Sequence, residues 1–277
     1  MMMPYPRMRP DFLNRYLSLL GVPRRTPTLD GLRELVQAHL RCVPFENISK
    51  LYYMRHLGLR GLPGLELFLD GHERFSFGGT CYPNNYYFYR LLAGLGYQVM
   101  LCGADMANPD VHLVSMVDLD GRQFLVDVGY AAPFEVPLPR DLQSDHVIEL
   151  GQDRYVLKPQ DSDGRSRLEL HRNGKLTHGY TAKPVPREID EFAAVIVDSY
   201  RDEATFMNAL LLARFFPGRS LVIHNLTVIE SRGRSVRMST LADKGELVDF
   251  IATNFGIPSY ITKVALDGLV MRGDAWN

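Results

Sequence analysis

The sequence predicts an α+β protein with a helical unit first, an antiparallel β-barrel or sandwich in the middle and a mixed unit last. Three observations support this order. Apolar residues recur at helical spacing through the first 95 residues, and β-rich segments separated by turn residues follow from Tyr97. Pro184-Val185-Pro186 then precedes a stretch with both patterns. We therefore expect three domains, at residues 1–95, 96–184 and 185–277.

The first helices are predicted from apolar spacing and capping residues. Residues Asp11–Leu20 place their apolar side chains on one helical face, and Gly21-Val22-Pro23 ends this helix. Thr28 or Asp30 is suited to cap a second helix. Glycine and proline punctuate Leu57–Leu69, where we expect a turn and a short helix. A phosphate-binding loop is not predicted there, because no strand precedes it and no Lys-Ser/Thr pair follows.

The central unit is predicted from short β-rich segments that alternate with turn-forming pairs. Asp120-Gly121 and Asn173-Gly174 are pairs favoured in two-residue hairpin loops, and further turns are expected at Gly151-Gln152 and Asp163-Gly164. The predicted strands are Gln98–Gly103, Val111–Leu119, Arg122–Val128, Val147–Leu150, Arg154–Lys158, Arg167–Arg172 and Leu176–Tyr180.

The last unit combines helical and strand patterns. We expect a helix around Glu203–Arg214, strands at Leu221–Glu230 and Ser235–Ser239, and a helix at Lys244–Phe255. This mixture predicts an α/β unit, distinct from the two preceding ones.

Charge and hydropathy restrict the classes of partner. The chain has 31 basic and 32 acidic side chains among 277 residues, so bulk charge does not favour a nucleic acid or a membrane surface. No apolar run is long enough to span a bilayer, and Met1–Pro10 lacks the features of a signal peptide. We therefore expect no nucleic-acid partner and no membrane partner.

The cysteines point to a reducing compartment. Cys42, Cys81 and Cys102 form an odd set without paired spacing, which predicts a cytoplasmic setting and no disulfide framework. No two histidines have metal-ligand spacing and no Cys-X-X-Cys occurs, so we expect no metal site. Cys42 and Cys102 lie in apolar surroundings and are expected to be inert.

Cys81 is the candidate nucleophile. It follows Gly78-Gly79-Thr80 and should lie in the first turn of a helix that continues to Gly94-Leu95-Gly96, with Thr80 as the N-cap. Unpaired N–H groups at a helix start favour the thiolate over the thiol. The alternative is that Cys81 is a small buried apolar residue beside a tight turn, unless the chain also supplies a base.

The hairpin at Asp120-Gly121 supplies a base and a residue to orient it. A two-residue loop pairs Leu119 with Arg122, and the same register puts His112 and Asp127 on one face of the sheet as diagonal neighbours. A carboxylate there would fix one imidazole tautomer and leave the other nitrogen for a thiol. The Cys81, His112 and Asp127 combination is a triad as in thiol-protease-like folds. The alternative is a hydrogen-bonded core histidine beside a carboxylate that caps a turn.

These motifs resemble the arylamine N-acetyltransferases, cytosolic enzymes that use acetyl-CoA. Pro44-Phe45-Glu46-Asn47-Ile48 is similar to the family's Pro-Phe-Glu-Asn-Leu segment, and Gly78-Gly79-Thr80-Cys81 with Asn85 falls on its Arg-Gly-Gly-X-Cys-X-Glu-X-Asn motif. His112 and Val126-Asp127-Val128-Gly129-Tyr130 fall on its histidine and Val-Asp-Val-Gly-Phe segments. The resemblance extends over nearly the whole chain in order. It implies a helical bundle, a β-barrel and an α/β lid.

The resemblance implies ping-pong acyl transfer from acetyl-CoA to a small amine, with Cys81 as nucleophile, His112 as base and Asp127 as orienting residue. It further implies that Phe45 and Tyr130 line the acceptor pocket. The loop from Gly129 to Phe134 would lie beside the coenzyme A pyrophosphate, with Gly129, Ala131, Ala132 and Pro133 as its binding residues. Alternatives that keep the triad are a thiol hydrolase and an amide synthase, and a third is a catalytically weak relative that binds small molecules.

The chain departs from the family pattern beside the nucleophile. Phe77 stands where the motif has arginine and Pro83 stands where it has glutamate. If Glu46 is buried it needs a different partner, and Arg41 or Arg74 are candidates. Ala131-Ala132 also replace the usual glycines. We expect these changes to affect the acyl donor and the rate more than the fold.

Overall fold

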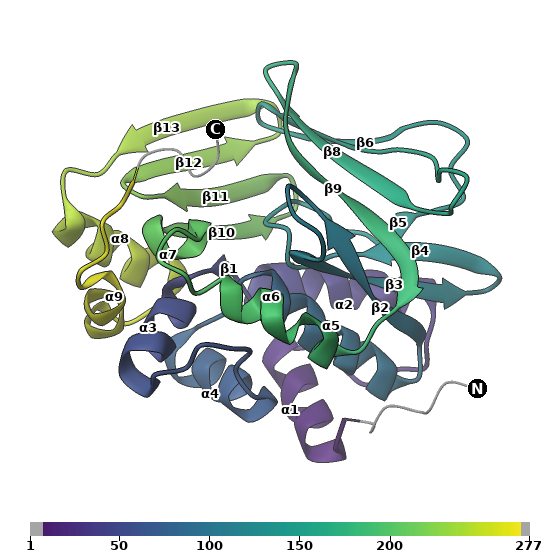
Figure 1. Cartoon of the computed structure of the whole chain (residues 1–277), viewed down its shortest axis with the longest axis horizontal. Coiled ribbons are helices and arrows are strands. Elements are labelled where there is room, and N and C mark those ends of the chain that lie inside the picture. Colours follow the sequence, from purple (N-terminus) through teal and green to yellow (C-terminus); the bar gives the residue numbers. More distant parts are fainter. Residues whose placement is uncertain (1–7, 273–277) are drawn as a thin grey trace.

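A computed structural model describes residues 8–272 of the chain. A layer of N-terminal helices lies beneath two antiparallel sheets, one of five strands and one of eight, as Figure 1 shows. Two C-terminal helices, α8 and α9, flank the five-stranded sheet. Across residues 8–272, none of the helices combines the length and apolar composition that crossing a membrane requires.

The helical layer contains five helices among the described residues up to Leu95; four of them were predicted, and α3 was not. Thr28 caps α2 by accepting a hydrogen bond from the Gly31 N–H. The helix α5 is buried over most of its length and packs against β2 and β3 of the larger sheet. The helices are α1 (Pro10–Leu20), α2 (Leu29–Cys42), α3 (Ile48–Leu57), α4 (Leu65–Phe75) and α5 (Cys81–Leu95).

The eight-stranded sheet curls into a half-barrel, with β5 and β6 as its edges (Figure 1). The predicted strands and turns of the central unit are all present. The predicted boundary after residue 184 falls within β9. The strands are β2 (Gln98–Asp105), β3 (His112–Leu119), β4 (Arg122–Val126), β5 (Leu138–Pro139), β6 (His146–Leu150), β7 (Asp153–Leu157), β8 (Ser166–Arg172) and β9 (Lys175–Pro186).

The five-stranded sheet joins the start of the chain to its end. The short strand β1 (Phe45–Glu46) pairs with β10 (Leu211–Phe216), followed by β11 (Arg219–His224), β12 (Thr227–Arg232) and β13 (Ser235–Thr240). The helix predicted at Glu203–Arg214 is wrong, because only the short α7 (Thr205–Asn208) is helical and β10 follows. Because β10 lies between two strands and is mostly buried, five of its six residues are apolar, with Arg214 as the exception, and the strand lacks polar–apolar alternation.

The predicted single strand at Leu221–Glu230 is also wrong. Asn225 adopts a left-handed conformation, with φ of 54°, and the pair His224–Thr227 closes a two-residue hairpin between β11 and β12. The remaining predicted elements of this unit are present, and α8 has the predicted bounds. Its other helices are a 3₁₀ turn at Ile189–Phe192, α6 (Ala193–Asp198), α8 (Lys244–Phe255) and α9 (Ser259–Leu266).

The β3–β4 hairpin has the predicted register. Leu119 pairs with Arg122, and the ladder continues to the pair Ser115–Val126. It stops there, so the further pairing predicted for His112 with Gly129 is not formed as part of the ladder. The side chain of Asn85 lies between the two strands instead, donating to the Leu113 carbonyl at 2.6 Å and accepting from the Val128 N–H at 2.9 Å.

Candidate active site

Cys81 is the first residue of α5 and is 8% exposed. Thr80 occupies the N-cap position in extended conformation, although its side chain makes no capping hydrogen bond. The preceding glycines lie against Pro44-Phe45-Glu46, where Glu46 N–H donates to the Gly79 carbonyl at 3.0 Å. A Cβ at Gly78 would lie 1.8 Å from the Pro44 carbonyl oxygen. The two motifs thus form one packed unit that fixes the start of the helix.

His112 and Asp127 are buried together beside this helix start. The Nε2 of His112 donates to Oδ2 of Asp127 at 2.8 Å, and both side chains are at most 1% exposed. The other ring nitrogen, Nδ1, is therefore the one left for a thiol. The predicted proximity of His112 and Asp127 is present, and the structure brings both to Cys81 through the packing of α5 on β3.

The environment of His112 favours its protonated form. Burial opposes protonation, but the charge of Asp127 and hydrogen bonds to Asp127 and Cys81 raise the pKa of His112 to about 10. An imidazolium held at this position can serve as the counter-ion of a thiolate. The geometry can therefore support a thiolate–imidazolium pair.

Asn85, one turn into α5, holds Asp127 in place. Its amide nitrogen donates to Oδ1 of Asp127 at 2.8 Å, and the Gly129 N–H donates to the same oxygen at 3.0 Å. Gly129 also lies against the nucleophile, since a Cβ there would be 2.9 Å from the Cα of Cys81. Asn85 thus links the nucleophile helix to both strands of the hairpin. Its motif position was evident from the sequence, but its role was not.

The other cysteines lie in apolar surroundings. Cys102 is fully buried in β2, and burial raises its pKa to about 12. Burial also raises the pKa of Cys42. Neither residue has a histidine–carboxylate pair comparable to that of Cys81, which makes Cys81 the candidate nucleophile among the three.

Cys81 borders a cavity of about 1030 Å³, large enough for a sizeable organic ligand. The cavity wall comes from α3, α5, the loop before β3, β9 and the segment from α6 to α7. The lining residues include Lys50, Cys81, His178, Asp198, Ser199 and Phe206.

Phe45 and Tyr130, predicted to line the acceptor pocket, lie behind the residues that line this cavity. The Phe45 ring contacts the ring of Phe206, with centroids 5.6 Å apart. The hydroxyl of Tyr130 lies 2.7 Å from Nδ1 of His178. Both predicted residues are nearly buried, so they support cavity-lining side chains in this structure.

The residues predicted to lie near the coenzyme pyrophosphate have different surroundings. Gly129 packs on Cys81, while Ala132 and Pro133 are buried. Ala131 has a positive φ of 60° and borders a separate cavity of about 130 Å³ between the two sheets. The assignment of these four residues to coenzyme binding stays a prediction.

Glu46 is buried, but neither candidate arginine is its partner. Its Oε1 accepts from the Gly78 N–H at 3.1 Å and its Oε2 from the Ser49 N–H at 2.8 Å. Within residues 8–272 no basic side chain forms an ion pair with it; Arg41 is exposed and Arg74 lies over the Phe75 ring. Burial raises the pKa of Glu46, and these hydrogen bonds oppose the rise. Backbone amides are sufficient partners here, so the expected arginine replacement was wrong.

Phe77 occupies the expected arginine position within an aromatic cluster. It is 1% exposed, and its ring lies 5.3 to 5.9 Å from those of Tyr52, Tyr53 and Phe75. The loss of the arginine is therefore compensated by packing on α3 and the end of α4.

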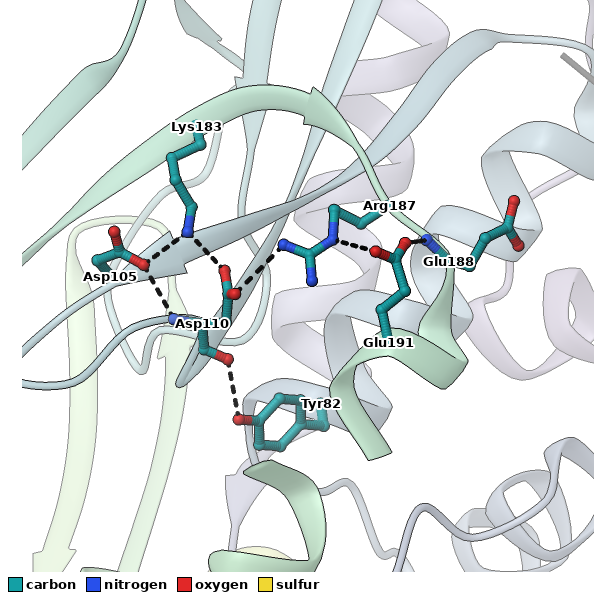
Figure 2. Close-up of polar contacts among 7 residues, drawn as sticks. All are labelled: Tyr82, Asp105, Asp110, Lys183, Arg187, Glu188 and Glu191. Atoms are coloured by element: carbon teal, nitrogen blue, oxygen red, sulfur yellow. Dashed lines mark hydrogen bonds and ion pairs between the residues drawn. The ribbon is translucent and has the colours of Figure 1, made fainter. Parts of the chain in front are cut away.

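A charged cluster holds the loop that leads into His112, as Figure 2 shows. Asp110 accepts from Lys183 at 2.7 Å and from Arg187 at 3.2 Å, and its carbonyl accepts from the Tyr82 hydroxyl at 3.3 Å. Partial burial opposes ionisation of Asp110, but Lys183 and Arg187 lower its pKa. Since Tyr82 follows Cys81 and Asp110 precedes His112 by two residues, the cluster links the two catalytic segments.

The described part of the chain, residues 8–272, contains no group of three or more His, Cys, Asp and Glu side chains suited to hold a metal ion.

Two residues at this site could not be identified from the sequence. Lys50 and Asp110 look like surface charges in the sequence. Their partners come from segments far along the chain.

Known proteins are similar to this chain in sequence and in fold. A family model described as N-acetyltransferase matches residues 28–263. The chain is 24% identical over 257 residues to the arylamine N-acetyltransferase / N-hydroxyarylamine O-acetyltransferase of Salmonella typhimurium, covering 89% of each chain. It is 27% identical to the proansamycin X synthase of Amycolatopsis mediterranei, covering 83% of this chain and 92% of that one.

The match to human arylamine N-acetyltransferase 1 is 30% identical over 142 residues, which is 48% of this chain and 47% of the human one. Among solved structures, the Salmonella typhimurium arylamine N-acetyltransferase has a TM-score of 0.77 at 20% identity, covering 95% of this chain and all of that one. The Mycobacterium marinum arylamine N-acetyltransferase in complex with CoA has a TM-score of 0.76 at 23% identity, and the match covers 93% of this chain and 99% of that one. These two structures share the fold of this chain.

Proposed function

Because this chain belongs to the arylamine N-acetyltransferase family, we propose that it transfers an acetyl group from acetyl-CoA to an arylamine or arylhydrazine through a thioester on Cys81. The observation that carries the proposal is the buried chain of contacts from Cys81 through His112 to Asp127 at the wall of a large cavity. A nucleophile, a base and an orienting carboxylate are the parts that such transfer requires.

In the first half-reaction the Cys81 thiolate attacks the thioester carbonyl of acetyl-CoA. A tetrahedral intermediate forms, and backbone N–H groups at the start of α5 stabilise its oxyanion. The intermediate then expels the CoA thiolate, which takes a proton from the His112 imidazolium. The product is S-acetyl Cys81 and free CoA.

In the second half-reaction an amine enters the same cavity and attacks the acetyl-Cys81 carbonyl. Neutral His112 accepts the ammonium proton, and the Cys81 thiolate leaves, which restores the starting ion pair. Asp127 keeps the imidazole oriented, as its hydrogen bonds from Asn85 and Gly129 support.

Acetyl-CoA is the proposed donor because the related Mycobacterium marinum structure holds CoA. We further propose a cytoplasmic location, where acetyl-CoA and free thiols coexist. Gly129, Ala131, Ala132 and Pro133 stay the proposed segment beside the CoA pyrophosphate, and Phe45 and Tyr130 the proposed support of the acceptor pocket.

A second candidate is an amide synthase that uses the same triad on a different thioester. The relative named proansamycin X synthase favours it, since the match covers 92% of that chain. The two candidates differ in the donor. An amide synthase of this kind would not be acylated rapidly by acetyl-CoA.

Initial-rate kinetics distinguish the candidates. Acetyl-CoA and 4-methoxyaniline should give parallel double-reciprocal lines, because CoA leaves before the amine reacts. Intersecting lines would show direct transfer in a ternary complex. Acetate release without amine would favour a thiol hydrolase, and no CoA release at all would favour the synthase or a binding protein.

A further inference from the structure

Lys50 is a buried cation in the wall of the cavity that contains Cys81. It lies in the first turn of α3 and is 8% exposed. Lysine is rarely buried to this extent unless an opposite charge accompanies it. Its presence here therefore calls for a physical explanation.

The contacts of Lys50 within the protein supply no negative charge. Its Nζ donates to the carbonyl and the hydroxyl oxygen of Ser199, each at 2.7 Å, and lies 4.0 Å from the centre of the Tyr200 ring. No carboxylate of residues 8–272 lies within ion-pair distance of it. Three neutral groups thus orient the ammonium without neutralising it.

One carboxylate that lines the same cavity is already paired. Asp198, which lines the same cavity, forms an ion pair with Arg201 at 2.8 Å, and both side chains are more than half exposed. Asp198 is therefore held in solvent, away from the buried ammonium. Within residues 8–272, Lys50 therefore has no carboxylate in direct contact with its ammonium.

We propose that Lys50 binds a carboxylate carried by a substrate, which places a negatively charged group of that substrate in the cavity beside Cys81. This inference rests on the proposed acyl transfer, because it takes the bound molecule to be a substrate of that reaction. Lysine pairs with a carboxylate as a point charge, and the pair is strong where water is excluded. A neutral substrate would leave the ammonium unpaired.

The ionisation of Lys50 agrees with this role. Burial lowers its pKa to about 7, and the charge of Cys81 opposes the decrease. An incoming carboxylate would restore the protonated form, as an opposite charge at short range does.

The carboxylate has two possible sources, the amine acceptor and the acyl group, and each gives one arm of the test. In the acceptor arm, calorimetry measures binding of 4-aminobenzoate and the neutral 4-aminobenzamide to the full chain without any acyl donor. The parent should bind the acid more tightly than the amide, and Lys50→Met should remove this preference, a change of about tenfold to a hundredfold.

In the acyl arm, the rates at which succinyl-CoA and acetyl-CoA acylate the protein are compared by rapid-quench mass spectrometry. A succinyl preference that Lys50→Met removes would assign the carboxylate to the acyl group. Lys50→Arg retains the charge and should retain the preference in whichever arm shows it. Lys50→Gln, which can still bond to Ser199, replaces the methionine variant should that variant fail to fold.

The proposal is overturned if the parent prefers the carboxylate in neither arm, or if the preference survives in both Lys50→Met and Lys50→Gln. The binding arm needs no catalysis. A selective loss of 4-aminobenzoate binding would therefore support the Lys50 site even in a protein that no acyl-CoA acylates, and the proposed function alone would then fail.

Discussion

Two cationic side chains are buried beside Cys81, and the protein treats them in opposite ways. His112 has an ionised partner of its own, Asp127, which raises its pKa to about 10. Lys50 has only Ser199 and the Tyr200 ring, and burial lowers its pKa to about 7. The chain itself supplies the counter-charge of His112, so this residue is paired before any substrate binds. The charge at Lys50 is left for a ligand to complete.

Removing the internal partner of His112 should have the largest effect. In Asp127→Asn the side-chain amide can donate to Nε2, which moves the ring proton to Nδ1 and leaves the wrong tautomer facing Cys81. We expect acylation by acetyl-CoA to fall by about 10³- to 10⁴-fold, measured in a single turnover.

The control is Asp118→Asn, the same change at an exposed position on β3. It should acylate at the parent rate, and both variants should have the parent's circular dichroism. Parent-like acylation by Asp127→Asn would mean that His112 does not depend on this carboxylate.

Glu46 extends the comparison to a buried carboxyl group whose hydrogen bonds come from backbone amides. Phe77→Arg would restore the residue type of the family motif, but it would place a guanidinium in a packed aromatic cluster. We expect a loss of about 3 kcal/mol in the free energy of unfolding, because the charge is desolvated and the ring contacts are lost.

Urea unfolding measures this loss, and Phe75→Arg is the control because Phe75 belongs to the same cluster but is half-buried. The loss in the free energy of unfolding should be smaller for Phe75→Arg than for Phe77→Arg. A Phe77→Arg variant as stable as the parent would contradict the conclusion that packing of Phe77 has replaced the motif arginine.

The cluster around Asp110 tests how far the catalytic pair depends on surrounding charges. Asp110→Asn weakens the contacts with Lys183 and Arg187 that hold the loop before His112 (Figure 2). We expect single-turnover acylation to fall about tenfold, since small displacements of reacting groups reduce rate strongly. Glu191→Gln, at the exposed end of the cluster, should stay within about twofold. Equal rates for both variants would contradict a positioning role.

The smallest effect is the pH dependence of the Lys50 site. Because the anion binds the protonated amine, carboxylate affinity should fall as pH rises through about 7, by roughly fivefold between pH 7 and pH 8. Calorimetry with the acid preferred in the earlier test measures this fall. The carboxylate affinity of Lys50→Arg should not change over the same pH range, because the guanidinium stays charged.

Other ionisable groups also line this cavity. They are Cys81, Tyr82, His178, Asp198, Arg201 and Glu203. They are unchanged in Lys50→Arg. An equal fall in Lys50→Arg would assign the pH dependence to one of them and remove it from Lys50.

The sequence was most informative where structure is local. Cys81 lies at the predicted helix start, and the Asp120-Gly121 loop set the hairpin register that brings His112 to Asp127. Both depend on residues close in the chain, for which periodicity and turn chemistry are strong signals.

The sequence was least informative where partners are distant or environments are uniform. The β10 strand was mistaken for a helix because burial on both faces removes alternation. Lys50 meets Ser199 across 149 positions of sequence, so no local pattern indicates that it is buried. The insertion of Asn85 into the hairpin depends in the same way on how α5 packs against the sheet.

The most direct test of the account is to locate the acyl group. The protein is mixed briefly with acetyl-CoA, quenched in acid, digested and examined by mass spectrometry, with Cys81→Ala in parallel. We expect one acetyl group on the peptide containing Cys81, none on those containing Cys42 or Cys102, and its loss when 4-methoxyaniline is added before quenching. Acetylation at Cys102, or turnover of acetyl-CoA and amine that persists in Cys81→Ala, would contradict the account.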